Sequence, residues 1–194
     1  MPERPTRERI IDTTAQLLQR QGYHGTGLNQ ILDDAKAPKG SMYFHFPGGK
    51  EQLAAEAITR AGDYLDTALA AHRRDSAEGS LDAYLADVAK LLEATNYTDG
   101  CPIATVSLEV APTIPHLADA CQHAYAQLLD RIRGWLEEDG FTTDDADERA
   151  FLIYAAIEGA LVFAKAQRSS QPIERLRAQL PSLLRRPSNR RARI

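Results

Sequence analysis

The residues best suited to chemistry stand together in one short segment, Ala37–Leu53, whose sequence is APKGSMYFHFPGGKEQL. This segment crowds tyrosine, phenylalanine and histidine between two elements that combine glycine with lysine. Three kinds of structure could carry such a pattern: a phosphate-binding loop, a core helix, or a helix that lies against nucleic acid. Lysine and polar ring groups can hydrogen-bond phosphates, and small residues let a helix approach base edges.

The phosphate-loop interpretation fails on spacing. A Walker A loop requires G-x-x-x-x-G-K-[ST] directly after a strand. Here Gly48-Gly49-Lys50 is followed by Glu51, so no hydroxyl group is available for Mg²⁺. The sequence before the segment also has no strand pattern, which excludes this class of site.

The core-helix interpretation explains only part of the segment. Phe44 and Phe46 are two positions apart, so on a helix they cannot both share the face of Tyr43. At least one of them must pack back on the neighbouring helices. The lysines, Gly40 and His45 have no task in a core helix, whereas a helix that reads DNA uses them all.

Helical periodicity dominates the chain, and no run of residues alternates as a strand would. We therefore expect an all-α protein of about nine helices. The first three helices are predicted at about Thr6–Gly22, Thr26–Asp34 and Pro38–Phe46. Two short helices joined by a tight connection form a helix-turn-helix unit, whose second helix enters the major groove.

Six further helices are predicted after this three-helix unit. They are expected at about Lys50–Arg73, Ser80–Thr95, Ile103–Val110, Ile114–Glu138 and Asp144–Arg168, with a last helix that begins at Pro172 and is interrupted at Pro181. The predicted domains are the helix-turn-helix unit at 1–49, a helical bundle at 50–186, and a disordered basic tail at 187–194.

Composition favours a soluble cytoplasmic protein. The chain has 194 residues and two cysteines, which is too few for a disulfide framework and favours a reducing compartment. The N-terminal residues are charged and have no apolar region typical of a signal peptide. The longest apolar run, Phe151–Ala164, is shorter than a membrane span and contains Glu158, so we expect a buried helix and no membrane partner.

Charge is distributed unevenly along the chain. Residues 1–50 contain seven Lys or Arg against five Asp or Glu, whereas residues 51–174 contain nine against 22. A weakly basic end on an acidic body is consistent with a protein that contacts DNA through one end only. A chance distribution with a basic tail would give the same counts, so charge alone does not decide.

The segment resembles the TetR family of bacterial transcriptional regulators. The resemblance rests on Thr26, Ile31, the run AKAPKGSMYFHF at Ala35–Phe46, Lys50-Glu51 and Leu53. Compared with that family's pattern, Lys36 replaces the usual glycine of the turn and Pro38 replaces the usual serine. One extra residue also stands between Phe46 and Lys50. Together with CPIATVSLEVA at 101–111, the chain resembles the LmrA/YxaF-like branch over most of its length.

The resemblance implies a dimeric DNA-binding repressor whose C-terminal helices bind a small hydrophobic effector, with no enzymatic activity and no cofactor. By family position, DNA contacts are implied for Thr26, Lys39, Tyr43, His45 and Lys50, mostly with phosphate. Lys36, Gly40 and Ser41 are our candidates for the side that faces the bases, and the Lys36 contact is the weakest of these because it replaces a glycine.

The C-terminal helices contain polar and aromatic residues within apolar stretches, as a ligand pocket requires. The candidate effector-binding residues are Tyr64, Tyr84, Cys101, Thr105, Ser107, Tyr125, Tyr154 and Glu158. Glu158 could face a pocket or pair across a dimer, because an unpaired carboxylate is costly to bury. Prolines bracket the helix at Ile103–Val110, which could act as a hinge beside the effector.

The helix around Phe151–Ala164 is apolar nearly all round, so it must be covered on more than one side. A two-fold partner that presents the same helix would provide that cover. The candidate dimer-interface residues are Phe151, Tyr154, Ala155, Gly159, Val162, Leu176 and Leu180.

Other classes of function find little support in the sequence. The scattered cysteines and histidines, such as Cys101 and Cys121, do not have the spacing of a metal site, so no metal is predicted. The alternative from a different class is a helical ligand-binding or enzymatic bundle whose first 50 residues are only structural. A regulator in which ligand strengthens DNA binding also remains possible on sequence alone.

Overall fold

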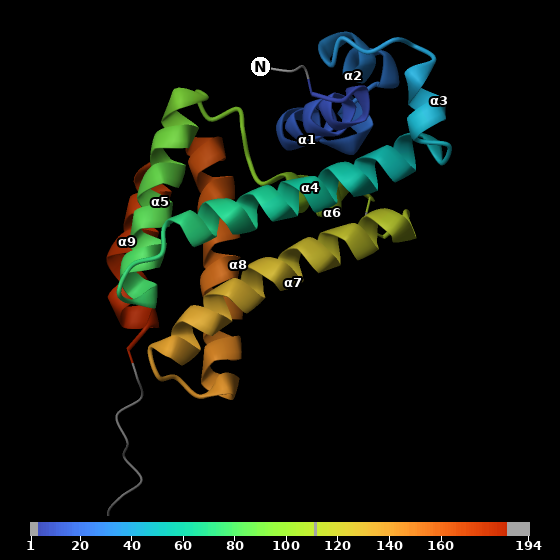
Figure 1. The fold of residues 1–194 in the computed structure, drawn as a ribbon. Helices are drawn as coiled ribbons and strands as arrows, with labels where there is room; N and C mark the ends of the chain where they lie inside the picture. Colours follow the sequence, from blue (N-terminus) through green and yellow to red (C-terminus); the bar gives the residue numbers. More distant parts are fainter. Residues whose placement is uncertain (1–3, 111, 186–194) are drawn as a thin grey trace, which may run out of the picture.

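A computed structural model of the chain describes residues 4–110 and 112–185. Nine α-helices and no strand occur within these ranges, so the predicted all-α class is confirmed (Figure 1). The predicted disordered tail, 187–194, lies outside the described residues.

The first three helices form a compact unit at one end of the molecule (Figure 1). They are α1 (Thr6–Gly25), α2 (Leu28–Asp34) and α3 (Ser41–His45). The side chains that close its core are almost completely buried: Ile10, Leu18, Ile31, Met42 and Phe46. Because Met42 and Phe46 are four positions apart, they anchor one side of α3 and leave its other side to solvent.

The remaining helices form the elongated body. They are α4 (Gly49–Ala71), α5 (Ala77–Ala94), α6 (Pro102–Val110), α7 (Pro115–Glu138), α8 (Thr143–Gln167) and α9 (Gln171–Leu183). α4 leads from the three-helix unit into the body and packs along α7, while α5, α8 and α9 pack together beyond it (Figure 1). The predicted division at residues 49 and 50 remains a prediction, because α4 contacts both α1 and α7.

Two turns at glycines shape the three-helix unit. α1 bends at Gly22, where the backbone has φ 72° and ψ −175°, and one more turn follows. The extra residue before Lys50 is accommodated at Gly49, whose φ is 69° and whose N–H donates to the carbonyl of Phe46. Both φ values lie in the left-handed region, which glycine adopts without strain.

Three helix ends differ from the sequence prediction. α3 begins at Ser41 and not at Pro38. α5 begins at Ala77 and is capped by Ser76, whose hydroxyl accepts from the N–H of Gly79, whereas the predicted cap, Ser80, is fully buried. Pro181 does not interrupt α9, which continues to Leu183. A proline in the last turn removes a single hydrogen bond and has little helix after it to disturb.

Within the single chain, the predicted burial of Phe151–Ala164 is found on only one side of α8. Taken over its whole length, α8 is long and apolar enough to cross a membrane, and only 28% of its most apolar window is buried within the chain. The exposed large side chains are Phe151, Leu152, Val162 and Phe163. A helix with this much bare apolar surface needs a further cover.

Three candidate interface residues do not belong to that exposed face. Tyr154 and Leu176 are each 9% exposed, and Leu180 is fully buried, because α8 and α9 pack against each other and α9 packs on α5. These three side chains are thus already covered within the single chain, and their role as dimer contacts remains a prediction. Ala155 is exposed and Gly159 is half-buried, with open space where a Cβ of Gly159 would lie.

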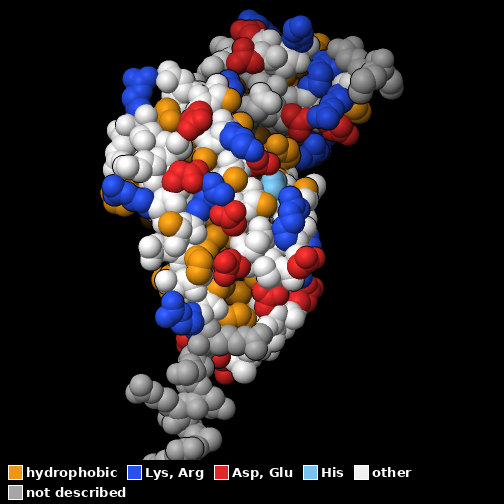
Figure 2. All heavy atoms as spheres, turned by 90° about the vertical axis from the view of Figure 1, so that its left-hand side faces the viewer, with side chains coloured by type: hydrophobic (Ala, Val, Ile, Leu, Met, Phe, Trp, Pro, Cys, Tyr) orange, Lys and Arg blue, Asp and Glu red, His pale blue; other side chains and the backbone are white. Residues whose placement is uncertain are grey.

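Figure 2 shows the side of the molecule that α5 and α9 form in Figure 1. Lys, Arg, Asp and Glu side chains are mixed over the upper part of this surface, and hydrophobic side chains gather in the lower half of the body. The mixture of signs means that no large field of one charge covers this side.

Candidate nucleic-acid interface and ligand pocket

The solvent side of α3 carries most of the residues predicted to contact DNA. Lys39 and Gly40 are exposed, Tyr43 is 67% exposed, and Ser41 and His45 are half-buried. Within the described part of the chain, the Lys39 ammonium has no hydrogen-bond or ion-pair partner, so it is available to a phosphate. The Ser41 hydroxyl instead donates to the carbonyl of Pro38, which orders the start of the helix.

Phe44 is a member of this surface that the sequence analysis did not assign to DNA. Its side chain is 82% exposed, and its ring lies edge-on to His45 with 4.9 Å between centroids. The signal was available in the spacing, because burial of Met42 and Phe46 on one side of α3 turns Phe44 outward. An exposed aromatic ring beside Tyr43 can contact sugars or thymine methyl groups.

The turn between α2 and α3 explains why the usual glycine can be absent. Lys36 adopts a left-handed conformation with φ 51°, which is strained for a residue with a side chain. The guanidinium of Arg9 holds this turn by donating to the carbonyl of Ala35 at 3.1 Å and to that of Lys36 at 3.3 Å. The Lys36 side chain is exposed.

We expect Lys36→Gly to stabilise the protein and weaken its binding to DNA. Relief of the left-handed strain should raise the free energy of unfolding by about 1 kcal/mol, which corresponds to roughly 2–4 °C in Tm for a chain of this size. Lys36→Ala is the matched control, because it removes the ammonium and keeps the strain. Thermal unfolding of the two variants separates these effects, and equal Tm values would contradict the explanation.

Two residues that family position assigned to DNA are engaged inside the protein. The Thr26 side chain is fully buried and its hydroxyl donates to the carbonyl of Gly22 at 2.6 Å, and its predicted DNA contact remains a prediction. The Lys50 ammonium lies 2.7 Å from the carbonyl oxygen of Tyr23 and 4.2 Å from the centroid of that ring. Burial lowers the pKa of Lys50, and its phosphate contact remains a prediction.

A cavity of about 280 Å³ opens in the body between α4, α5 and α8. Five of the predicted effector-binding residues line it: Tyr64, Tyr84, Cys101, Tyr154 and Glu158. The segment that leads into α6 also lines it through Asp99 and Gly100, and α1 contributes Gln19. The structure thus decides that Glu158 faces the pocket.

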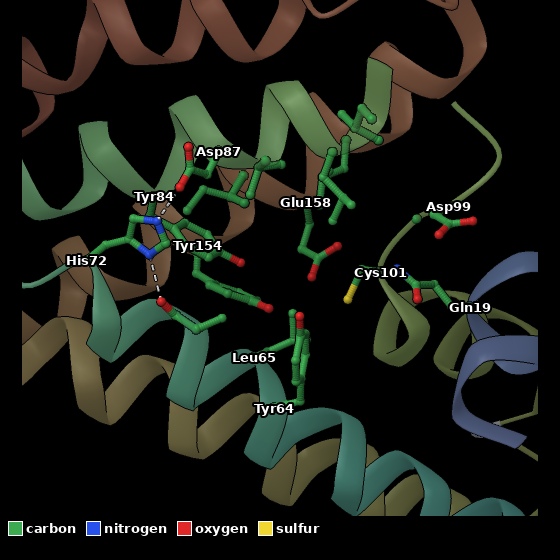
Figure 3. Close-up of a pocket in the computed structure, with 17 residues that line it drawn as sticks. Gln19, Tyr64, Leu65, His72, Tyr84, Asp87, Asp99, Cys101, Tyr154 and Glu158 are labelled. Atoms are coloured by element: carbon green, nitrogen blue, oxygen red, sulfur yellow. Dashed lines mark hydrogen bonds and ion pairs between the residues drawn. The ribbon is translucent and has the colours of Figure 1, made fainter. Parts of the chain in front are cut away.

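The Glu158 carboxylate points into this pocket, toward the space that Tyr64, Tyr154 and Cys101 also face (Figure 3). Both carboxylate oxygens are buried and have no hydrogen-bond partner among the described residues. Burial raises the pKa of Glu158, and the Cys101 thiol and the Tyr154 hydroxyl, which lie nearby as hydrogen-bond donors, offset part of that rise. An unsatisfied buried group of this kind costs about 1–3 kcal/mol, and more when charged.

The other predicted effector residues lie outside the pocket. The hydroxyl of Thr105, on α6, donates at 2.9 Å to the carbonyl of Cys101, the residue directly before this helix. Ser107 has a buried hydroxyl oxygen without a partner in the described chain, and Tyr125 packs edge-on behind Tyr154 with 5.9 Å between centroids. None of the three lines this cavity, and their role in binding an effector remains a prediction.

Polar residues that the sequence analysis missed close the far end of the pocket. The Nδ1 atom of His72 lies 2.7 Å from the carbonyl oxygen of Ala68, and its Nε2 atom lies 2.9 Å from the carboxylate of Asp87. Hydrogen bonds from His72 and then Lys90 lower the pKa of Asp87 to about 2. No motif pointed to these residues, because the pair joins the end of α4 to the middle of α5.

Neither cysteine has the environment of a reactive thiol. Cys101 and Cys121 are both buried, and burial raises the pKa of each thiol, that of Cys101 well above its usual value. Because the thiolate is the nucleophilic form, both side chains are expected to be inert at neutral pH.

Two contacts tie the pocket wall to the three-helix unit. Before α6, the guanidinium Nε of Arg20 donates to the carboxylate of Asp99 at 3.0 Å. Near the end of α6, the Glu109 carboxylate accepts hydrogen bonds from the N–H groups of Tyr23 at 2.8 Å and His24 at 3.0 Å. Its other oxygen would lie 1.8 Å from a Cβ at Gly22, so this approach requires glycine.

Comparison with known proteins matches two parts of the chain to families of transcriptional regulators. Residues 10–57 match the family described as bacterial regulatory proteins of the tetR family, and residues 77–179 match the LmrA/YxaF-like C-terminal domain of transcriptional regulators. Members of the family bind operator DNA, typically act as dimers and typically respond to small molecules.

Relatives match along nearly the whole chain. The HTH-type transcriptional regulator LmrA of Bacillus subtilis is 35% identical, with 93% of this chain and 97% of that protein covered. The HTH-type regulator YxaF of the same organism is 31% identical, with 93% and 96% covered. These relatives are regulators and not enzymes.

A crystal structure of a TetR transcriptional regulator from Legionella pneumophila superposes with a TM-score of 0.84 at 19% identity, covering 95% of this chain and all of that one. This likeness concerns the fold alone. The helix-turn-helix unit and the C-terminal bundle, each matched by its own family, show that the chain belongs to the TetR family of bacterial transcriptional regulators, in its LmrA/YxaF-like branch.

Proposed function

We propose that the protein is a cytoplasmic, homodimeric repressor that binds operator DNA through α3 and leaves it when a small hydrophobic effector enters the pocket. The observation that carries the proposal is the solvent side of α3. Lys39, Tyr43 and Phe44 stand exposed there, while Met42 and Phe46 fix the helix on a rigid core. A recognition helix needs both properties, because base contacts are specific only when the helix is held in a fixed register.

The bare face of α8 supports the dimer. Phe151, Leu152, Val162 and Phe163 form an apolar surface on one helix, and a two-fold axis would cover each copy with the other. Gly159, in the middle of this face, allows close approach of two backbones. Two recognition helices joined in this way can contact two half-sites of one operator, at a spacing of about 34–36 Å.

Regulation is supported by the path from the pocket to the DNA-binding unit. The segment before α6 lines the pocket, and Glu109 near the end of α6 holds the bend of α1. A ligand that shifts α6 would therefore move the unit that carries α3. Such an effector acts only through a difference in its affinity for the DNA-bound and free states.

The first experiment is to select bound sequences from a random DNA pool and then measure the salt dependence of binding. We expect Lys39→Ala to weaken binding to all sequences alike and to reduce the slope of log K against log salt by about 0.9. Lys165→Ala removes an exposed cation from the far end of α8 and should leave the slope unchanged.

If no sequence is enriched, and Lys39→Ala leaves affinity and slope intact, the DNA-binding role fails and a bundle that binds only ligand is the better description. An effector that raises operator affinity would retain the regulator and reverse the direction of control.

A further inference from the structure

The charged side chains that line the pocket are all acidic, and the lining histidine, His72, already has a contact at each ring nitrogen. Among the lining residues are three acids, Asp87, Asp99 and Glu158, and no lysine or arginine. Two of the acids already have basic partners in the protein, of which only His72 also lines the cavity. Asp87 is bound by His72 and by Lys90, whose ammonium lies 2.8 Å away, and Asp99 is bound by Arg20. Among the three, only Glu158 has no Lys, Arg or His partner in the described part of the chain.

His72 does not serve as the partner of Glu158. Its two ring nitrogens face the carbonyl of Ala68 and the carboxylate of Asp87, and Figure 3 shows it at one end of the pocket, away from Glu158. Lys165, two turns further along α8, is exposed and holds its ammonium near the backbone of Gly100 at the pocket wall. The carboxylate inside the cavity is therefore left without a cation of the protein.

Aromatic rings surround the same space. Tyr64 stands at the mouth of the pocket, 70% exposed, and Tyr84 and Tyr154 lie deeper on α5 and α8. The faces of such rings attract cations, most strongly where water is excluded. The rest of the wall is aliphatic, with Leu65 and Ile157 among its members, so it suits an apolar scaffold.

We propose that the ligand of this pocket is an organic cation, a protonated or quaternary amine on an apolar scaffold, whose positive charge lies against the Glu158 carboxylate and the tyrosine rings. The volume of about 280 Å³ suits a small molecule, at the lower end of the usual pocket range of roughly 300–1,000 Å³. This inference depends on the proposed function only in naming the ligand an effector, because binding itself is independent of DNA.

A matched pair of probes tests the charge directly. Benzyltrimethylammonium and its uncharged carbon isostere, neopentylbenzene, have nearly the same shape and differ by one charge. Calorimetry with the full-length protein should show the cation binding more tightly by about tenfold or more. Glu158→Gln should reduce this preference to about twofold or less, whereas Glu148→Gln, an exposed acid on the same helix, should retain it.

The pH dependence gives a second readout that needs no variant. Benzyltrimethylammonium carries a permanent charge, so only the protein titrates. Burial raises the pKa of Glu158 above its usual value, and the cation requires the ionised form. Affinity for the cation should therefore be full above that raised pKa and fall as the pH is lowered through it, while affinity for neopentylbenzene should not follow the same curve.

Equal affinity of the two probes for the wild-type protein, a pH-independent preference, or an unchanged preference in Glu158→Gln would each overturn the proposal. An operator titration without probe is run in parallel. A protein that binds operator but does not prefer the cation refutes the ligand class alone. A protein that prefers the cation but binds no operator refutes the proposed function alone.

Discussion

Replacing Phe163 with glutamate is expected to split the proposed dimer. In a single chain this side chain is already 61% exposed, so the charge costs the monomer little. In a two-fold dimer the substitution occurs twice on the same buried face, and each carboxylate would lose water without gaining a partner. At about 2 kcal/mol for each copy, the dimer dissociation constant should rise roughly 1,000-fold. Sedimentation velocity across a concentration series measures it.

Operator binding should fall with the dimer. Two joined recognition helices bind one operator with the advantage of a high effective concentration, which a monomer on a half-site lacks. We therefore expect operator affinity to fall about 100-fold or more at protein concentrations where the wild type is dimeric. The remaining binding should not distinguish a two-half-site operator from an isolated half-site.

Two further variants make the test specific to this face. Gly159→Leu adds an apolar side chain where a Cβ would meet nothing within 4 Å in the monomer, so it should also prevent close pairing without harming the fold. Leu108→Glu places the same charge on an 82% exposed leucine of α6 and should leave the dimer intact. A Phe163→Glu protein that remains dimeric and binds operator normally would show that the dimer forms elsewhere.

Glu109→Ala is expected to separate effector binding from DNA binding. The substitution removes the carboxylate that accepts from the N–H groups of Tyr23 and His24, while the pocket and α3 lose no residue. Effector affinity without DNA and operator affinity without effector should each stay within a few-fold of wild type. The factor by which operator weakens effector binding, usually about 5–150 in such proteins, should approach one. Titrating a binding compound with and without operator measures that factor.

Glu109→Gln keeps one acceptor oxygen and loses the charge, so its coupling factor should lie between those of wild type and Glu109→Ala. Asp119→Ala removes an exposed acid near the start of α7 and should change nothing. An undiminished coupling factor in Glu109→Ala, with a normal Tm, would mean that the Arg20–Asp99 pair or α4 transmits the effect instead.

The sequence by itself determined the helices and the family. The periodicity of apolar residues and the prolines and glycines at the ends are local properties, and they predicted the nine helices closely. The compact pattern from Thr26 to Leu53 identified the helix-turn-helix unit, because its turn and its buried positions are set within a few residues of each other. Local spacing could also have predicted that Phe44 points outward, since Met42 and Phe46 occupy the opposite side of α3.

Which part of the protein covers each helix face was decided by the tertiary structure alone. α8 is apolar nearly all round, so its sequence does not say that Tyr154 and Glu158 face the pocket while Phe151 and Val162 face solvent. Family position assigned Thr26 and Lys50 to DNA, but in the structure their side chains donate to the carbonyl groups of Gly22 and Tyr23.

The contact of Glu109 with Tyr23 joins residues 86 positions apart. Apolar periodicity indicates which side of a helix avoids water, but the helix that covers that side is determined by the packing of the whole chain. For the same reason, a buried carboxylate such as Glu158 finds or lacks a partner only after all nine helices are in place.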